Sequence, residues 1–335
     1  MFTEILKEVK NCYMNSSDGQ IDRTLREIKR AKRIVIHGKG RMGLILKAFG
    51  MHLSGYGYDV RTVGDVTAPA IGPGDFFLAA SASGYPSAST RFFEIAREKG
   101  ALSCAITAYR SGPVGMLADC FLEIHARTMN LDQNDVPSLQ PMCSTLEQTE
   151  LFILDYIAWL AGNKLENTRE NKEWYIDRVI YNAGQTDRKE CTRLGAWIHG
   201  RKRLFFYAGR RELMILSAFA MRIYHMGFLT YVMNEVTVPE IQSGDGIVTA
   251  CRNEDQKTLL QMEEAGRKGL VLALTGNITE RIKNKAQAVI KLPECEDDVA
   301  YTQTMLLFLD YTVAEMMKRY HMEEADLAVR HTNME

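Results

Sequence analysis

The sequence predicts a two-domain α/β protein in which each domain is a doubly wound parallel sheet covered by helices. Its 335 residues are more than one ordinary core needs and suit two domains of about 150 residues each. Short apolar runs alternate with helical patterns, which is typical of parallel sheets flanked by helices. The same pattern occurs twice along the chain, which indicates an internal duplication.

The first half contains five short apolar runs of the kind that form buried parallel strands. The run Arg33–His37 is continuous and ends at glycines, as a parallel strand does when it leads into a helix. Helical spacing of apolar residues follows most of these runs. We therefore expect strands at 33–37, 59–63, 76–80, 102–106 and 120–124, and helices at 43–52, 86–99 and 144–160.

The second half repeats the first at an offset of 203 − 33 = 170 residues. Residues 33–81 align without a gap with 203–251, and fifteen of these 49 positions are identical. Such agreement is far above chance and places equivalent strands in both halves. The polar run 162–172 is the natural boundary, so we expect one domain over 1–165 and a second over 166–335.

Composition excludes several classes of function. The formal net charge is −1 with both signs interleaved, which provides no basic surface for nucleic acid or for a membrane. The seven cysteines form no CxxC pair, and the histidines show no metal-ligand spacing, so we expect no disulfides and no metal. No apolar signal segment follows Met1. A cytoplasmic protein that binds a small molecule is expected.

Two strand-to-helix turns in the first half are rich in small residues, and such turns hold the ligand in open α/β sheets. The first, Gly38–Gly43, satisfies GxGxxG with Asp65 beyond it, so a dinucleotide site has to be weighed. The aligned turn Ala208–Leu213 lacks this spacing, which weakens that interpretation. The second turn, Ser81–Ser87, combines free helix-start amides with hydroxyl groups and could cradle a phosphate. The alternative is a serine-rich turn with a helix cap.

A resemblance to a known family rests on these turns. The stretch with Gly38–Gly43, Thr67-x-Pro69 and the SxSG loop resembles the 6-phospho-3-hexuloisomerase branch of the sugar isomerase (SIS) family. The segment from Gln140-Pro141-Met142 to Glu147-Gln148-Thr149 is similar to the signature that opens that family's last helix. The resemblance covers nearly all of each copy and implies a five-stranded parallel sheet. It also implies isomerisation of a sugar phosphate through a cis-enediol, without a cofactor.

The resemblance assigns roles to residues of the first copy. Glu147 is the implied base, because moving a carbonyl requires removal of a proton next to it. The alternative is a capping box with Ser144, three residues earlier. Four residues depart from the family pattern, so the identity of the sugar stays open: Ala82, Tyr85, Pro86 and Met42. The implied phosphate ligands are Ser81, Ser83, Gly84 and Ser87, and the implied sugar-binding residues are Gly38, Lys39, Gly40 and Arg41.

The second copy has a different set of residues at these positions. Glu254 and Asp255 place carboxylates where the phosphate would lie, and Thr302 replaces Glu147. His225 and the tail residue His331 nevertheless match the family pattern. Active sites of this family form between subunits, so we expect an intrachain pseudo-dimer in which both histidines complete the site of the first copy, and a further homodimer. The alternative for His225 is a packed histidine at a helix end.

Two other functions remain open from the sequence. One is a non-catalytic phosphosugar sensor, although such regulators usually carry a helix-turn-helix domain and only 32 residues precede Arg33. The other is a phosphosugar deglycase or aminosugar enzyme on the same scaffold. Proton exchange into sugar phosphates distinguishes the sensor from the enzymes.

Overall fold

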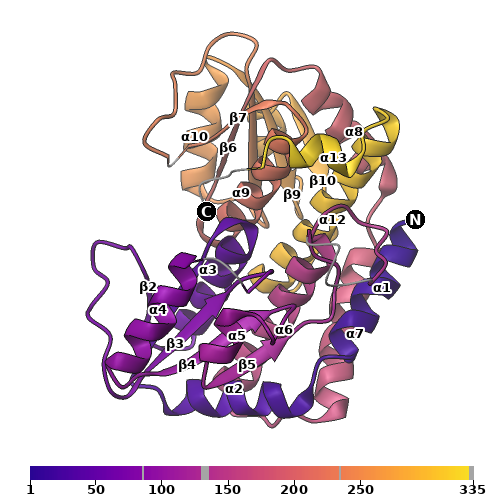
Figure 1. Ribbon diagram of the computed structural model, residues 1–335. Helices are drawn as coiled ribbons and strands as arrows, with labels where there is room; N and C mark the ends of the chain where they lie inside the picture. Colours follow the sequence, from indigo (N-terminus) through magenta and orange to yellow (C-terminus); the bar gives the residue numbers. More distant parts are fainter. Residues whose placement is uncertain (85–86, 130–135, 234, 332–335) are drawn as a thin grey trace. The chain divides into compact units, whose positions relative to one another are not determined.

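The chain divides into two compact units, the first from Met1 to Ile180 and the second from Tyr181 onward. The computed structural model describes residues 1–84, 87–129, 136–233 and 235–331, without the side chains of residues 87 and 88. Figure 1 labels most of the helices and strands of both units. Each unit contains one five-stranded sheet.

The first unit alternates strands and helices, as predicted. Its sheet has the order β2-β1-β3-β4-β5 and all of its strands are parallel. The elements are α1 (Phe2–Met14), α2 (Asp18–Arg30), β1 (Arg33–Gly38), α3 (Gly40–Gly55), β2 (Val60–Thr62), β3 (Asp75–Ala80), α4 (Ser87–Glu98), β4 (Leu102–Thr107), α5 (Pro113–Leu117), β5 (Cys120–Glu123), α6 (Ser144–Asn163) and α7 (Arg169–Gly184).

Helices cover both faces of this sheet, which explains why its central strands are apolar throughout. On one face, Val35 and Phe77 of the sheet pack with Phe93 of α4 and Val114 of α5. Helices α3 and α6 pack together on the other face, where α1 and α2 contact α6. Every residue of β3 is buried. The loops at the carboxyl ends of β1 and β3 are thereby fixed by a rigid core.

The second unit repeats this architecture. Its order, β10-β9-β8-β6-β7, is the same arrangement read from the opposite edge, and its strands are also parallel. The elements are α8 (Arg188–His199), β6 (Arg203–Ala208), α9 (Arg210–His225), β7 (Leu229–Val232), β8 (Gly246–Cys251), α10 (Gln256–Gly266), β9 (Leu270–Thr275), α11 (Glu280–Lys285), β10 (Ala288–Lys291), α12 (Asp298–Arg319) and α13 (Glu324–Ala328). The predicted fold class is confirmed in both halves.

The units divide later in the sequence than the expected boundary after residue 165. The reason is that the start of α7 packs on the first unit. The buried amine of Lys172 donates to the Ser16 carbonyl at 2.6 Å and pairs with Asp18 at 2.7 Å. The Trp174 ring stacks on Trp159 at 5.2 Å between centroids. These contacts hold the polar run, expected to act as a boundary, against the first sheet's helices.

Among the described residues, no helix has both the length and the apolar character that crossing a bilayer demands.

Candidate active site

The turn after β1 brings the start of α3 against the end of the strand. A β-carbon on Gly43 would lie 2.2 Å from the Gly38 carbonyl oxygen, so only glycine fits there. Gly40 has φ +56°, in the left-handed region that favours glycine. Lys39 is the residue preceding the helix, and Gly40 and Arg41 form its first turn. The glycines thus fix where the Arg41 side chain begins.

Arg41 and Glu147 form a buried ion pair. The Arg41 Nε and Glu147 Oε2 atoms lie 2.7 Å apart, and the two side chains are only 2% and 8% exposed. Arg41 begins α3 and Glu147 lies in the first turn of α6, so the pair joins the carboxyl end of β1 to the last helix of the sheet. Two predicted site residues from distant parts of the sequence therefore meet.

The capping-box alternative for Glu147 is wrong. Helix α6 begins at Ser144 itself, and the residue that precedes it, Cys143, makes no side-chain cap bond. The Ser144 hydroxyl instead donates to the Pro141 carbonyl at 2.9 Å. The Glu147 carboxylate lies against Arg41.

A polar network holds the segment before α6, and the sequence analysis assigned it no role. The side-chain amides of Gln140 and Gln148 bond each other twice, at 2.8 Å each. Glu8 of α1 accepts hydrogen bonds from Thr145 and Ser138, both at 2.5 Å. These bonds fix the orientation of the first turn of α6, and Gln140 and Gln148 flank Glu147 in the quoted signature.

The serine-rich turn follows β3, as predicted, and part of it is described. Ser81 is buried, and its hydroxyl oxygen accepts a hydrogen bond from the Gly84 amide at 3.1 Å. Gly84 has φ +69°, and its carbonyl accepts from the Val114 amide at 3.1 Å. The Ser81 hydroxyl thus stabilises the turn and keeps a proton to donate. Ser83 is half-buried beside it.

The rest of this turn is only partly described. Tyr85 and Pro86 lie outside the described residues, as does the side chain of Ser87. The backbone of Ser87 begins α4, which agrees with a helix opening at this turn. The phosphate roles of Ser81, Ser83, Gly84 and Ser87 remain predictions.

Glu150 is a charged residue of this region that the sequence analysis did not single out. It is fully buried in α6, and neither of its carboxylate oxygens has a hydrogen-bond partner in the described structure. Burial, and then the charge of Glu147, raise the pKa of Glu150 well above its ordinary value. Its only sequence signal is a carboxylate three residues after Glu147, on the same side of the helix.

Comparison with known proteins shows the family of the chain. The SIS domain family profile matches residues 27–154. A protein of Methanothermobacter thermautotrophicus with no assigned function is 31% identical over 41% of this chain and 74% of its own length. The chain belongs to the SIS domain family. A 3-hexulose-6-phosphate isomerase of Bacillus subtilis is 27% identical to this SIS protein over 48% of the chain and 95% of the isomerase.

Solved structures support the fold of both units. The tagatose-6-phosphate ketose/aldose isomerase of Escherichia coli has a TM-score of 0.66 to this chain at 15% identity. The similarity covers 100% of this chain and 97% of the isomerase chain. At that identity the likeness speaks for the fold alone.

The second unit has carboxylates at the turn that matches the serine-rich turn of the first unit. Asp255 caps α10 by accepting from the Thr258 amide at 2.9 Å. Glu254 accepts a hydrogen bond from Thr279 and one from Arg281. A helix start that binds its own carboxylate offers little attraction to a phosphate. Burial, with help from nearby Asp298, raises the pKa of Glu212 to about 7 at the same edge.

The second unit also lacks the arginine–glutamate pair. Arg211 occupies the position of Arg41, and its Nε donates to the Thr302 hydroxyl at 3.1 Å. Thr302 stands where the first unit has Glu147, so the position carries no base. The equivalent arginine is retained while the carboxylate is lost.

The two histidines predicted for the site lie together in the second unit. His225 is the last residue of α9 and is 4% exposed. Its ring lies 5.4 Å from that of His331, which follows α13. The predicted roles of His225 and His331 in a site shared with the first copy remain untested. The position of His225 at a helix end also agrees with the packed-histidine alternative.

Within the described part of the chain, no cluster of three or more His, Cys, Asp or Glu side chains is arranged to hold a metal ion.

Proposed function

We propose that this SIS protein is a phosphosugar isomerase that moves a carbonyl between neighbouring sugar carbons without a cofactor. The 3-hexulose 6-phosphate reaction is the closest named case, because a relative with that name aligns over 95% of its length. The identity of the sugar is also only proposed, because four residues depart from the family pattern: Met42, Ala82, Tyr85 and Pro86.

The buried pair of Arg41 and Glu147 carries the proposal. A carboxylate held out of water is a suitable base for a carbon-bound proton. The guanidinium at 2.7 Å balances its charge and orients it, and the turn that holds the arginine is fixed by Gly38 and Gly43. The second unit has the equivalent arginine without a carboxylate partner at the matched position, which favours the first unit as the place of the chemistry.

In the proposed reaction Glu147 removes the proton from the carbon next to the carbonyl. The electrons of the broken C–H bond form the C=C bond of a cis-enediol, and the former carbonyl oxygen takes up a proton. Protonation of the other enediol carbon and loss of a hydroxyl proton then give the isomer. The turn at Ser81 and Ser83 holds the phosphate, which places the reacting carbons at a fixed distance.

Solvent deuterium exchange tests this proposal directly. The chain is incubated in deuterated water with a panel of hexose and pentose phosphates, and incorporation at carbon is followed by NMR. We expect exchange with at least one sugar phosphate, reduced about 100-fold or more in Glu147→Gln. Thr302→Val, at the matched position of the second unit, serves as the control and should leave the exchange unchanged. Absence of exchange with every sugar, or full activity of Glu147→Gln, would contradict the proposal.

A further inference from the structure

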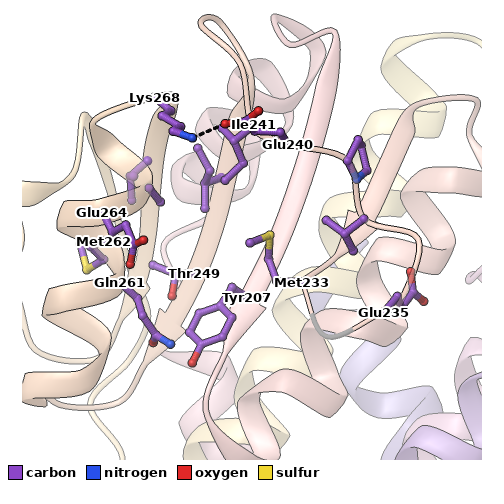
Figure 2. Close-up of a pocket in the computed structure, with 15 residues that line it drawn as sticks. Tyr207, Met233, Glu235, Glu240, Ile241, Thr249, Gln261, Met262, Glu264 and Lys268 are labelled. Carbon is purple, nitrogen blue, oxygen red and sulfur yellow. Dashed lines mark hydrogen bonds and ion pairs between the residues drawn. The ribbon is translucent and has the colours of Figure 1, made fainter.

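The second unit contains a cavity of about 700 Å³ that the proposed function does not use. It lies on one face of the sheet, between β6, β8, α10 and the described residues 233 and 235–241 (Figure 2). Its residues all belong to the second unit. A cavity of this size is in the range that binds small organic molecules.

Part of the cavity lining differs from the first unit by the replacement of aromatic side chains. There the Phe92 ring lies 4.6 Å from His37, and Phe93 packs edge-on against Phe77 at 5.1 Å. Helix α10 of the second unit is the counterpart of α4. The buried residues of the two helices match when Ser89 is aligned with Thr258 and Phe93 with Met262.

In this alignment Gln261 takes the place of Phe92. Ile247 takes the place of Phe77 at the offset of 170 residues (247 − 77). Three rings are therefore replaced by narrower or more flexible side chains, Gln261, Met262 and Ile247.

Polar atoms without partners are placed at one end of this cavity. The Thr249 hydroxyl and the Gln261 side-chain oxygen are buried and have no hydrogen-bond partner among the described residues. Thr249 is only 3% exposed. Figure 2 shows both side chains gathered with the Tyr207 phenol at the end opposite Lys268. Buried polar atoms normally find partners, so a bound molecule with a donor group would complete this end.

The charges around the cavity restrict what it can bind. Its charged lining residues are Glu235, Glu240, Glu264 and Lys268, and Lys268 is already paired with Glu240. The excess of carboxylates repels anions such as sugar phosphates. The apolar lining from Ile247 and Met262 favours a flat hydrophobic body.

We propose that this cavity is a second ligand site, for an uncharged or cationic organic molecule with a flat apolar body. A donor group on that molecule would bond the Gln261 oxygen, and the Thr249 hydroxyl would bond a polar atom beside it. The site is separate from the phosphate turn of the first unit, and the proposal stands whether or not the chain is an isomerase.

Binding of matched fluorescent probes tests the proposal on the full chain. Dansylamide is neutral and carries N–H donors, and 5-(dimethylamino)naphthalene-1-sulfonate has the same rings with a negative charge. We expect saturable binding of one dansylamide per chain, followed by its fluorescence, and at least tenfold weaker binding of the sulfonate. Equal affinity for the two probes would overturn the proposed charge preference.

Two variants locate the site. Gln261→Phe restores the ring found in the first unit and should weaken dansylamide binding at least tenfold. Leu260→Phe adds the same ring at the neighbouring position of α10, which is 55% exposed, and should bind as the original protein does. Thr249→Val preserves shape, tests the site if Gln261→Phe fails to fold, and should weaken binding about threefold or more. Unchanged binding in folded Gln261→Phe, or in Thr249→Val if the first variant does not fold, would overturn the proposal.

Discussion

Two buried carboxyl groups of α6, those of Glu147 and Glu150, have different surroundings. Glu147 faces a guanidinium at 2.7 Å, whereas Glu150, three residues further along, has no described partner. An unpartnered carboxyl group in a core carries a desolvation cost, which it reduces by remaining protonated. The second unit places Met305 at the equivalent position, where it is fully buried. Glu150 is therefore a source of instability in α6.

Replacing Glu150 with methionine should stabilise the protein. Loss of a buried carboxyl without a partner is expected to raise stability by about 1–3 kcal/mol at neutral pH. The reverse change at the matched position, Met305→Glu, should destabilise the second unit by a similar amount. Thermal melting of both variants gives the two shifts, and a lower Tm for Glu150→Met would show that the carboxyl makes a favourable contact.

The gain in stability from Glu150→Met should depend on pH. Burial raises the folded-state pKa of Glu150, so the folded chain holds this proton to higher pH than the unfolded chain does. Stability from this group therefore falls as pH rises above the unfolded pKa, and the loss is complete only above the folded pKa. The advantage of Glu150→Met over the original protein should grow from pH 4 to pH 8. An advantage that is constant with pH would contradict the assignment of a raised pKa.

At the scale of elements, the starts of α3 and α9 adopt the same backbone with different residues. Gly40 has φ +56° and Arg210, its equivalent, has φ +46°. A left-handed backbone costs a non-glycine residue about 1–2 kcal/mol of stability. Glycine avoids this cost, but it loses more conformational entropy on folding, which offsets part of its advantage. The duplicated turn thus retained its shape after the glycine that suits it was lost.

Exchanging the residues at these turns should change stability in opposite directions. Arg210→Gly is expected to raise stability by about 0.5–1 kcal/mol, because the strain is relieved. Gly40→Ala should lower it by about 1 kcal/mol, since alanine would have to adopt positive φ. Urea unfolding of the two variants provides the comparison. Shifts of the same sign would contradict the view that one backbone geometry is shared by both turns.

At the scale of the whole molecule, the two units have the same sheet and different site residues. The first keeps the serine turn, Arg41 and Glu147, and the second keeps Arg211 with Thr302 and the pair of His225 and His331. Duplication followed by divergence leaves each copy's core intact while its loops change. The expected sharing of one site by both copies, the further homodimer and the cytosolic location remain predictions.

Substitution of His225 tests the shared site. If His225 moves a proton in the isomerisation, His225→Ala should lower kcat about 100-fold with little change in KM for the sugar phosphate. His321→Ala, at an exposed position near the end of α12, is the control and should retain full turnover. Unchanged turnover in His225→Ala would leave this residue with the role of a packed histidine at a helix end.

The sequence alone determined the alternation of strands and helices, the duplication and the identity of the turns. These features are local or repeat along the chain, and apolar runs and glycines report them directly. The strands expected at 33–37 and 102–106 are observed at Arg33–Gly38 and Leu102–Thr107. The family-like signature also singled out Glu147.

Only the tertiary structure decided which of these residues meet. The ion pair of Arg41 with Glu147 joins positions more than 100 residues apart, and the isolation of Glu150 depends on what surrounds α6 on every side. The cavity beside Gln261 is lined by residues of β6, β8 and α10, which are separate in the sequence. Pairing, burial and empty volume are properties of neighbours in space, and a linear pattern does not record them.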